Sequence, residues 1–329
     1  MKSEKAIVHV HTLGEFAYCP LAGLLAYKQQ GQNKFDEPVR IPNLGFEPIF
    51  EHALLVAERH RLGKALAINS SAFFVVMLTL ILIAKFTSPM LGVSLSISTL
   101  PLVIALVRGI QSLVNILAQL ETYQHCLPQE IDFSNKTIQS VTWWGLVKSG
   151  LRTTVRREPL EDRESALVGK PNRVLEDNGI GHFPVIVHRH SAKSELKVSQ
   201  SHLIKLAAYS HLIQVNEDAN ADWGIVIDSE TLEGFAVPIS NQQLEGMNRQ
   251  LVELHSLLGS GGSVAKPPEW KCRKCHRGKP RKYVAGLTET IVHGIQVIPR
   301  LSLNATGQEV HSDCGDENKW IPPHEYWSI

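Results

Sequence analysis

The sequence predicts a mixed α/β protein into which a two-helix hairpin, long enough to cross a membrane, is inserted. Residues 184–258 alternate between β-branched and amphipathic stretches in the order strand, helix, strand, strand, helix, which is typical of an α/β core. Residues 65–107, by contrast, contain a single charged side chain, that of Lys85. A chain of 329 residues is long enough to form one large or two smaller domains.

The elements of the α/β part follow from the spacing of its apolar residues. Residues 184–190 alternate as a strand does, which puts Ile186, His188 and His190 on one face. Residues 202–214 carry apolar side chains at helical spacing. We expect two further strands at 222–227 and 234–238, a helix at 241–258 that ends at a glycine-rich segment, and an extra hairpin within 288–303.

The hairpin consists of two uncharged runs, residues 65–84 and 86–107. Each run is long enough to span a bilayer core of about 30 Å as a helix. Residues 73–83 have almost no polar side chain, as contact with lipid on all sides requires, and an uncharged amphipathic stretch at 110–120 extends the second helix. The alternative is a helical hairpin buried in a soluble protein.

More basic residues flank the hairpin than lie between its two helices. Arg59, Arg61 and Lys64 precede the first run and Arg108 follows the second, whereas Lys85 alone lies between them. Because basic residues are retained on the cytoplasmic side, this bias predicts that both ends of the hairpin are cytoplasmic.

Three short motifs follow one another in the α/β part. They are GKPN at 169–172, PVIVH at 184–188 and KLAAY at 205–209, and they follow FAYCP at 16–20 and FEH at 50–52. In this order they resemble the motifs of the PD-(D/E)XK nucleases, in particular the RecB-like CRISPR-associated exonucleases, over roughly residues 8–60 and 140–283. The resemblance implies a restriction-endonuclease-like core, which is a mixed central sheet flanked by helices.

The chemical groups of that site are replaced. The resemblance implies an Asp where Asn172 stands, a Glu at Ile186, a Lys at His188 and a Gln at Lys205, while Tyr209 is retained. Mg²⁺ in such a site needs carboxylate oxygens, and the bound ion supplies the attacking water. We therefore expect a degenerate centre with no catalytic residues and no Mg²⁺.

Histidines near this centre leave an alternative open. His188 and His190, with His52 from the FEH motif and Asn172, could form a rebuilt site for Zn²⁺ or Mn²⁺ in an active metal-dependent nuclease. His9 and His11 form a second His-x-His pair. The competing interpretation is that these are ordinary histidines in a chain that contains fifteen.

The resemblance also implies an iron–sulfur cluster held by one N-terminal and three C-terminal cysteines. Cys19, Cys272 and Cys275 match three of the four positions, and His276 or Cys314 would have to supply the fourth ligand. A cluster usually has four cysteine ligands, whereas Zn²⁺ accepts three cysteines and a histidine, so we expect one or the other. The alternative is a decayed site of buried thiols. Five irregularly spaced cysteines indicate a reducing, cytosolic location for the globular part.

The net charge of +1 excludes a global basic field that would attract nucleic acid, so such binding requires a local patch. Candidate patch residues fall in two clusters: Arg152, Arg156 and Arg157, and Lys271, Arg273, Lys274, Arg277, Lys279, Arg281 and Lys282. A solvated face or contact with anionic lipid explains these clusters equally well.

Together these observations favour a membrane-anchored RecB-like pseudonuclease in the bacterial inner membrane, with both termini and the globular domain in the cytoplasm. It would bind nucleic acid or hold a protein partner or a second copy, and the resemblance suggests anti-phage defence. The alternatives are the active nuclease and a membrane sensor that oligomerises when it binds its ligand. We divide the chain into N-terminal nuclease-like residues 1–64, hairpin 65–120, α/β core 121–258, linker and cysteine pair 259–283, and extension 284–329.

Overall fold

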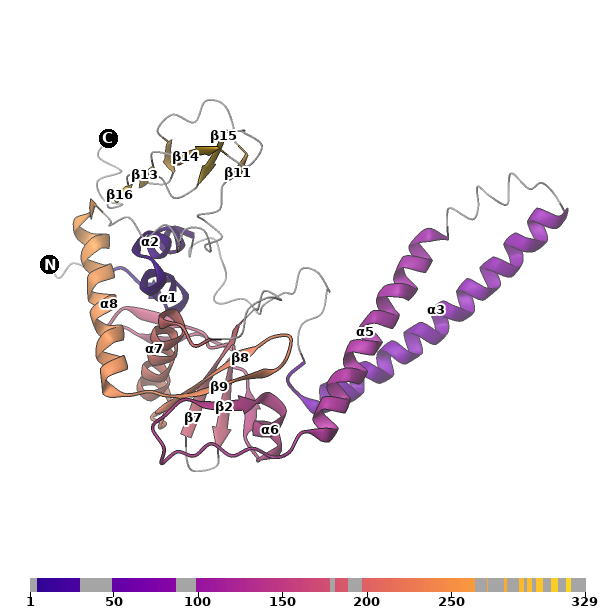
Figure 1. Cartoon of the computed structure of the whole chain (residues 1–329), viewed down its shortest axis with the longest axis horizontal. Helices are drawn as coiled ribbons and strands as arrows, with labels where there is room; N and C mark the ends of the chain where they lie inside the picture. Colours follow the sequence, from indigo (N-terminus) through magenta and orange to yellow (C-terminus); the bar gives the residue numbers. More distant parts are fainter. Residues whose placement is uncertain are drawn as a thin grey trace. The chain divides into compact units, whose positions relative to one another are not determined.

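The computed structural model shows a mixed α/β protein with two long apolar helices (Figure 1). It describes residues 5–29, 49–86, 99–177, 181–188, 197–263, 271, 281–282, 290–292, 295–297, 300–303, 309–312 and 318–320. The chain divides into two compact units. We call Met1–Glu37, Ile131–Val141 and Thr154–Ile329 the α/β unit, and Pro38–Glu130 with Thr142–Thr153 the hairpin unit.

The largest sheet is mixed and has six strands in the order β2-β9-β8-β7-β6-β3. Their bounds are β2 Gln139–Thr142, β3 Arg152–Thr154, β6 Arg173–Asp177, β7 Gly181–His188, β8 Trp223–Asp228 and β9 Glu233–Pro238. Strands β6 and β7 are antiparallel, as are β8 and β9, whereas β7 and β8 are parallel. A parallel pair needs a crossover, and helix α7, Gln200–Glu217, provides it.

Four helices build the layer that covers this sheet: α1 Val10–Tyr18, α2 Pro20–Gln29, α7 and α8 Asn241–Ser260. Helix α7 contacts β7 and β8 as well as α1 and α8. The buried side chains of these helices form one hydrophobic cluster with residues of the sheet, such as Val226 and Val237. This cluster is the core of the α/β unit.

Serines define where α7 and α8 begin. Ser199 and Ser240 each accept a hydrogen bond from the backbone N–H three residues later, and each helix has a complete capping box. Such a box satisfies two backbone N–H groups that the first turn of a helix leaves unbonded.

Three smaller sheets complete the described strands. Strand β1, Val8–His9, pairs in parallel with β5, Leu167–Gly169, which pairs with β4, Leu160–Asp162. The C-terminal segments form the sheets β10-β16-β13-β12 and β11-β15-β14. Their bounds are β10 Gly262–Ser263, β11 Arg281–Lys282, β12 Thr290–Val292, β13 Ile295–Val297, β14 Arg300–Leu303, β15 Glu309–Ser312 and β16 Asn318–Trp320.

Most of the expected elements of the α/β unit are present, with shifted ends. The strand expected at 184–190 already starts at Gly181, and the helix expected at 202–214 is one turn longer at its C-terminal end. The expected C-terminal hairpin is found as β12 and β13, but β14 pairs with β15, which lies beyond the expected stretch.

The hairpin unit contains α3, His52–Phe86, α5, Leu100–His125, and the short helix α6, Trp143–Lys148. Helices α3 and α5 pack along each other. A Cβ added to Gly109 of α5 would lie 2.8 Å from Leu66 Cδ2 of α3, so glycine permits the close approach there. Helix α5 starts at Leu100 rather than at 86, because Pro101 is tolerated only in the first turn of a helix.

Both long helices meet the length and composition of a membrane span. The segments His52–Leu82 and Leu100–His125 each contain an 18-residue apolar window, with mean hydropathies of 2.2 and 1.8, and 6% of each window is buried. Phe74 is 70% exposed and Val75 60%. The apolar surface of the hairpin therefore faces outward instead of forming a core, as far as the described residues show.

Aromatic side chains join the base of α3, the end of α5 and helix α6. Trp143 Nε1 donates to the carbonyl oxygen of Phe50 at 2.9 Å, and the rings of Phe50 and Trp143 meet edge to face. His52 stacks on Tyr123 with ring centroids 4.1 Å apart, and Tyr123 contacts Trp144 edge to face.

Candidate functional site

Two of the expected site positions, Ile186 and His188, lie in β7, and a third, Lys205, lies in α7. Arg173 pairs with Val185 in the β6–β7 ladder, so Asn172, one residue earlier, comes opposite Ile186. Ile186 and His188 are partly exposed and alternate with buried Val187, so they share one face of β7. Ile186 packs against the hydrophobic cluster of the covering helices. This is therefore the face that α7 covers.

His188 contacts a second histidine, His202 of α7. The His202 Nε2 and His188 Nδ1 atoms are 3.2 Å apart, and the rings meet at 74°. His202 is the third residue of its helix and its side chain completes the capping box, with Nδ1 accepting the Ser199 N–H at 3.3 Å. Since Nδ1 accepts, the proton of the neutral ring is on Nε2, which donates to His188.

Burial keeps His202 neutral. The residue is only 8% exposed. Its pKa is lowered from 6.5 to about 4, chiefly by desolvation. Repulsion by His188, when that ring is protonated, and by Lys205 acts in the same direction, whereas a hydrogen bond with the backbone of Lys197 opposes it. His202 is therefore uncharged at neutral pH.

Lys205, one turn further along α7, reaches helix α1. Its Nζ donates to His11 Nδ1 at 3.3 Å. The Lys205 stem lies directly on Gly14, where an added Cβ would be 2.1 Å from Lys205 Cε, and Ser201 Oγ donates to the Gly14 carbonyl at 2.8 Å. A glycine at position 14 therefore allows the ammonium group to reach the surface beside His11.

Tyr209 and Gly169 of the expected motifs pack against each other. Tyr209 is 3% exposed. A Cβ on Gly169 would lie 2.9 Å from Tyr209 Cε1 and 2.5 Å from Val10 Cγ2, so only glycine fits between α1 and α7 at this point of β5. The contact accounts for both residues without a catalytic role.

We refer to His11, His188, His202 and Lys205 as the His/Lys cluster. Within the described part of the chain, neither His202 nor Lys205 forms an ion pair with an Asp or Glu. Asp228 is the Cα partner of His188 in β8, and its Oδ1 accepts the N–H groups of Glu230 and Thr231 at 2.7 and 3.0 Å. The cluster thus offers N–H donors and positive charge.

The expected metal cofactor needs correction. No group of three or more His, Cys, Asp or Glu among the described residues could hold a metal ion. The prediction of an iron–sulfur cluster or a zinc ion is therefore wrong for this part of the chain: Cys19 is buried in the hydrophobic cluster. Cys272, Cys275, His276 and Cys314 lie outside the described residues.

One contact does link the two ends of the expected cysteine site. Lys271, next to Cys272, donates from Nζ to the carbonyl of Tyr18 at 2.8 Å, and the Tyr18 hydroxyl donates to the Lys271 carbonyl at 3.1 Å. Tyr18 directly precedes Cys19. Polar bonds between backbone and side chains thus hold these segments together.

The histidines expected in a rebuilt metal site have other partners or fall outside the described residues. His52 stacks on Tyr123 in the hairpin unit, and His188 contacts His202. His190 is outside the described residues. Neither His52 nor His188 belongs to a group of three or more potential metal ligands within the described part of the chain.

The expected basic patches are only partly described. Arg273, Lys274, Arg277 and Lys279 lie outside the described residues. Arg156 is already neutralised, because its guanidinium binds both oxygens of Glu217 at 2.5 and 2.6 Å and Glu176 Oε1 at 2.9 Å. Arg156 is therefore an ion-paired residue of the α/β unit and not a free cation.

The sequence patterns missed His202 as a partner of His188, and they missed this arginine network. A serine three residues before His202 is the spacing of a capping box, which would have placed His202 in the first turn of a helix. No local signal indicates the pairing of Arg156 with Glu217, which are 61 residues apart.

No protein-family model matches this chain, and no curated protein matches it. The structure defines the class of protein: a mixed α/β unit with mixed sheets, joined in sequence to two helices that are long and apolar enough to cross a membrane. The His/Lys cluster is its candidate site.

Proposed function

We propose that this chain is a membrane-anchored RecB-like pseudonuclease whose His/Lys cluster binds the phosphate backbone of nucleic acid without cleaving it. One observation carries the proposal. Lys205 Nζ lies 3.3 Å from His11 Nδ1, and His202 Nε2 lies 3.2 Å from His188 Nδ1. In the resemblance, His188 and Lys205 take the positions of a Lys and a Gln, while Asn172 and Ile186 replace the two carboxylates, so nitrogen donors remain without the groups that would hold a metal ion.

The chemistry of the cluster suits a phosphodiester better than a cation. Phosphate contacts from lysine and neutral N–H donors supply most of the affinity of sequence-independent binding. A metal ion between carboxylates and phosphate would otherwise provide the same attraction. Here the ammonium of Lys205 provides it directly, and binding needs no Mg²⁺.

The order of elements supports a restriction-endonuclease-like core. Strands β6 and β7 form an antiparallel pair, α7 crosses over, and β8 follows parallel to β7. This is a mixed sheet with a helix layer, and the β6–β7 register brings Asn172 opposite Ile186. The resemblance suggests a role in anti-phage defence.

Membrane anchoring is supported by the outward apolar surface of α3 and α5. Hydroxyl groups within this surface are bonded inside their own helix: Ser71 Oγ donates to the Ala67 carbonyl at 2.9 Å, and Thr79 Oγ1 to the Val75 carbonyl at 2.8 Å. Such bonds satisfy polar groups where no water is available. With Arg59, Arg61 and Lys64 before the first span, the α/β unit would be cytoplasmic at the bacterial inner membrane.

The test is binding of labelled single- and double-stranded DNA and RNA to the full chain in detergent, measured by fluorescence anisotropy in EDTA and in Mg²⁺. We expect salt-dependent binding of equal strength in both, with the nucleic acid intact. Lys205→Gln should weaken binding about fivefold, the value of one charged hydrogen bond of about 1 kcal/mol. Lys136→Gln removes the same charge from an exposed position of the α/β unit and should have no effect.

Two results would overturn the proposal. The first is equal binding by the wild type, Lys205→Gln and Lys136→Gln, which would mean that the cluster is not the site. The second is cleavage in Mg²⁺, Mn²⁺ or Zn²⁺ that His188→Ala abolishes, because the chain would then be an active nuclease. A change in assembly size on adding nucleic acid would add a sensor role to the binding.

A further inference from the structure

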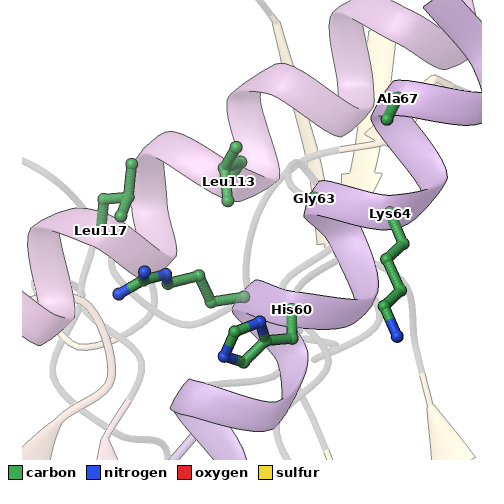
Figure 2. A pocket seen from close by; sticks show the side chains of 7 residues that line it. His60, Gly63, Lys64, Ala67, Leu113 and Leu117 are labelled. Carbon is green, nitrogen blue, oxygen red and sulfur yellow. The ribbon is translucent and has the colours of Figure 1, made fainter.

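A groove runs between α3 and α5 close to the base of the hairpin. Figure 2 shows the side chains that line it. One part is basic, with Arg59, His60 and Lys64 from α3, and the other is apolar, with Leu113 and Leu117 from α5. Its ligand should therefore carry negative charge at one end and hydrocarbon at the other.

The positive charge of the groove is not neutralised within the described part of the chain. Arg61, on the adjacent face, forms an ion pair with Glu58. Arg59 and Lys64 are exposed and form no ion pair with a described carboxylate, Glu121 of α5 included. An anion bound there would face two unpaired cations.

The groove lies where the apolar part of the hairpin begins. Lys64 is the last charged residue before the uncharged stretch 65–84. The contact of Leu66 with Gly109 brings Arg108 of α5 to the same level. In a membrane, this level is where headgroups meet acyl chains.

A glycine keeps the groove open. A Cβ built on Gly63 would meet no atom within 4 Å, whereas one on Gly109 would meet Leu66 at 2.8 Å. The helices therefore touch at Gly109 and leave free space beside Gly63. A larger side chain at position 63 would fill the groove without disturbing the packing of the helices.

We propose that this groove binds an anionic phospholipid, with its phosphate at Arg59 and Lys64 and an acyl chain along Gly63, Leu113 and Leu117. The inference rests on the membrane anchoring proposed above and is independent of nucleic-acid binding. Basic side chains beside an apolar surface attract anionic lipids through both charge and burial of hydrocarbon.

The experiment uses native mass spectrometry of the full chain in nonionic detergent with added phosphatidylglycerol, or with phosphatidylcholine of the same chain length. We expect tighter binding of phosphatidylglycerol. The double variant Arg59→Gln/Lys64→Gln should weaken it on the order of tenfold or more, since each cation near the surface contributes about fivefold. Gly63→Leu should weaken both lipids, because it fills the space for the chain.

Matched controls separate the groove from general effects of charge and bulk. Arg61→Gln removes the same charge three residues from Lys64, outside the groove, and should leave lipid binding unchanged. Gly246→Leu adds the same side chain at another open helical glycine, in α8, and should also have no effect.

The outcomes that contradict the proposal are distinct. Equal binding of the two lipids, or an equal loss in Arg61→Gln, would exclude the groove and leave the anchoring intact. If millimolar inorganic phosphate displaced the lipid, the groove would be a site for free phosphate instead. If Gly63→Leu changed the oligomeric state and no lipid bound, the occupant would be a second copy of the chain. If the chain stayed soluble without detergent, the anchoring and the lipid site would both fail.

Discussion

At the scale of single residues, His202 has two roles that both require its neutral form. Its Nδ1 completes the capping box of α7 by accepting a hydrogen bond, so that nitrogen must be unprotonated, and its Nε2 donates to His188. The third position of a capping box is usually Glu or Gln, neither of which gains positive charge in mild acid. The price of a histidine there is a stability that depends on pH.

We predict that acid destabilises the α/β unit through His202. Its folded pKa of about 4 lies below the ordinary 6.5, so between these values the unfolded chain takes up a proton that the folded chain does not. The free energy of unfolding is therefore complete above pH 6.5 and falls as the pH drops towards 4, by up to about 3 kcal/mol.

The variant His202→Gln tests this prediction, because glutamine preserves the capping box and does not titrate. Urea unfolding of the full chain in detergent at pH 7.5 and pH 5 should show a smaller loss for the variant than for the wild type. The same loss in both proteins would assign the acid sensitivity to other groups.

At the scale of elements, the Arg156 network joins β6, β7 and the end of α7. Glu176 belongs to β6, and Glu217 is the last residue of α7. His182 of β7 adds a contact from Nδ1 to Glu217 Oε2 at 2.7 Å. Burial acts to raise the pKa of both carboxyl groups, but the hydrogen bonds and positive charge of Arg156, with contributions from Thr154 and His182, together outweigh it and lower both pKa values. The network fixes the end of the crossover helix against the sheet.

Arg156→Ala should lower the free energy of unfolding by about 1–2 kcal/mol, since it leaves two carboxylates close together and only partly exposed. Arg163→Ala is the control: its side chain is 91% exposed and 3.5 Å from Glu161, so its loss should cost less than about 0.5 kcal/mol. A double-mutant cycle with Glu217→Gln, measured by urea unfolding, should give a coupling energy clearly above zero. A zero coupling energy would contradict the network.

Helix α6 holds the end of α5 in a similar way. Lys148 donates from Nζ to the carbonyls of Gln124 and Cys126 at 3.2 and 2.7 Å, and the ammonium lies 4.7 Å from the centre of the Tyr123 ring. A cation at the C-terminal carbonyls of a helix is favoured by the helix dipole. The base of the hairpin is therefore held by polar bonds, whereas its outer part exposes apolar side chains.

At the scale of the whole molecule, we predict that the chain remains in the membrane pellet after alkaline carbonate washing and is released by detergent. Reporters fused at the two termini should be cytoplasmic, and one inserted after Phe86 should be on the opposite side. The basis is the apolar exposure of α3 and α5 and the position of the flanking basic residues. Release by carbonate, or three reporters on one side, would contradict a membrane hairpin.

Much of the fold could be predicted because it depends on local periodicity. Residues of β7, α7, β8, β9 and α8 follow the two-residue or 3.6-residue repeat, and each element is found within a few residues of its expected ends. The start of α5 was missed because an apolar run does not show where a helix begins, while Pro101 does.

The candidate site could be predicted less well. The resemblance predicts a site at Asn172, Ile186 and His188; Ile186 and His188 lie in β7, and Asn172 directly precedes β6, the strand that pairs with β7. It did not indicate that Lys205 reaches His11, because Gly14 on another helix makes room for its stem. The metal prediction failed since ligand spacing along the chain does not ensure that the side chains converge.

The sequence by itself determined the α/β class, the order of the main elements and the presence of two apolar helices, because hydrophobic spacing acts over a few neighbouring residues. Only the tertiary structure decided which side chains meet: His188 with His202, Lys205 with His11, and Arg156 with Glu217. These contacts join residues 14, 194 and 61 positions apart. They arise from strand order and helix packing, which no local repeat encodes.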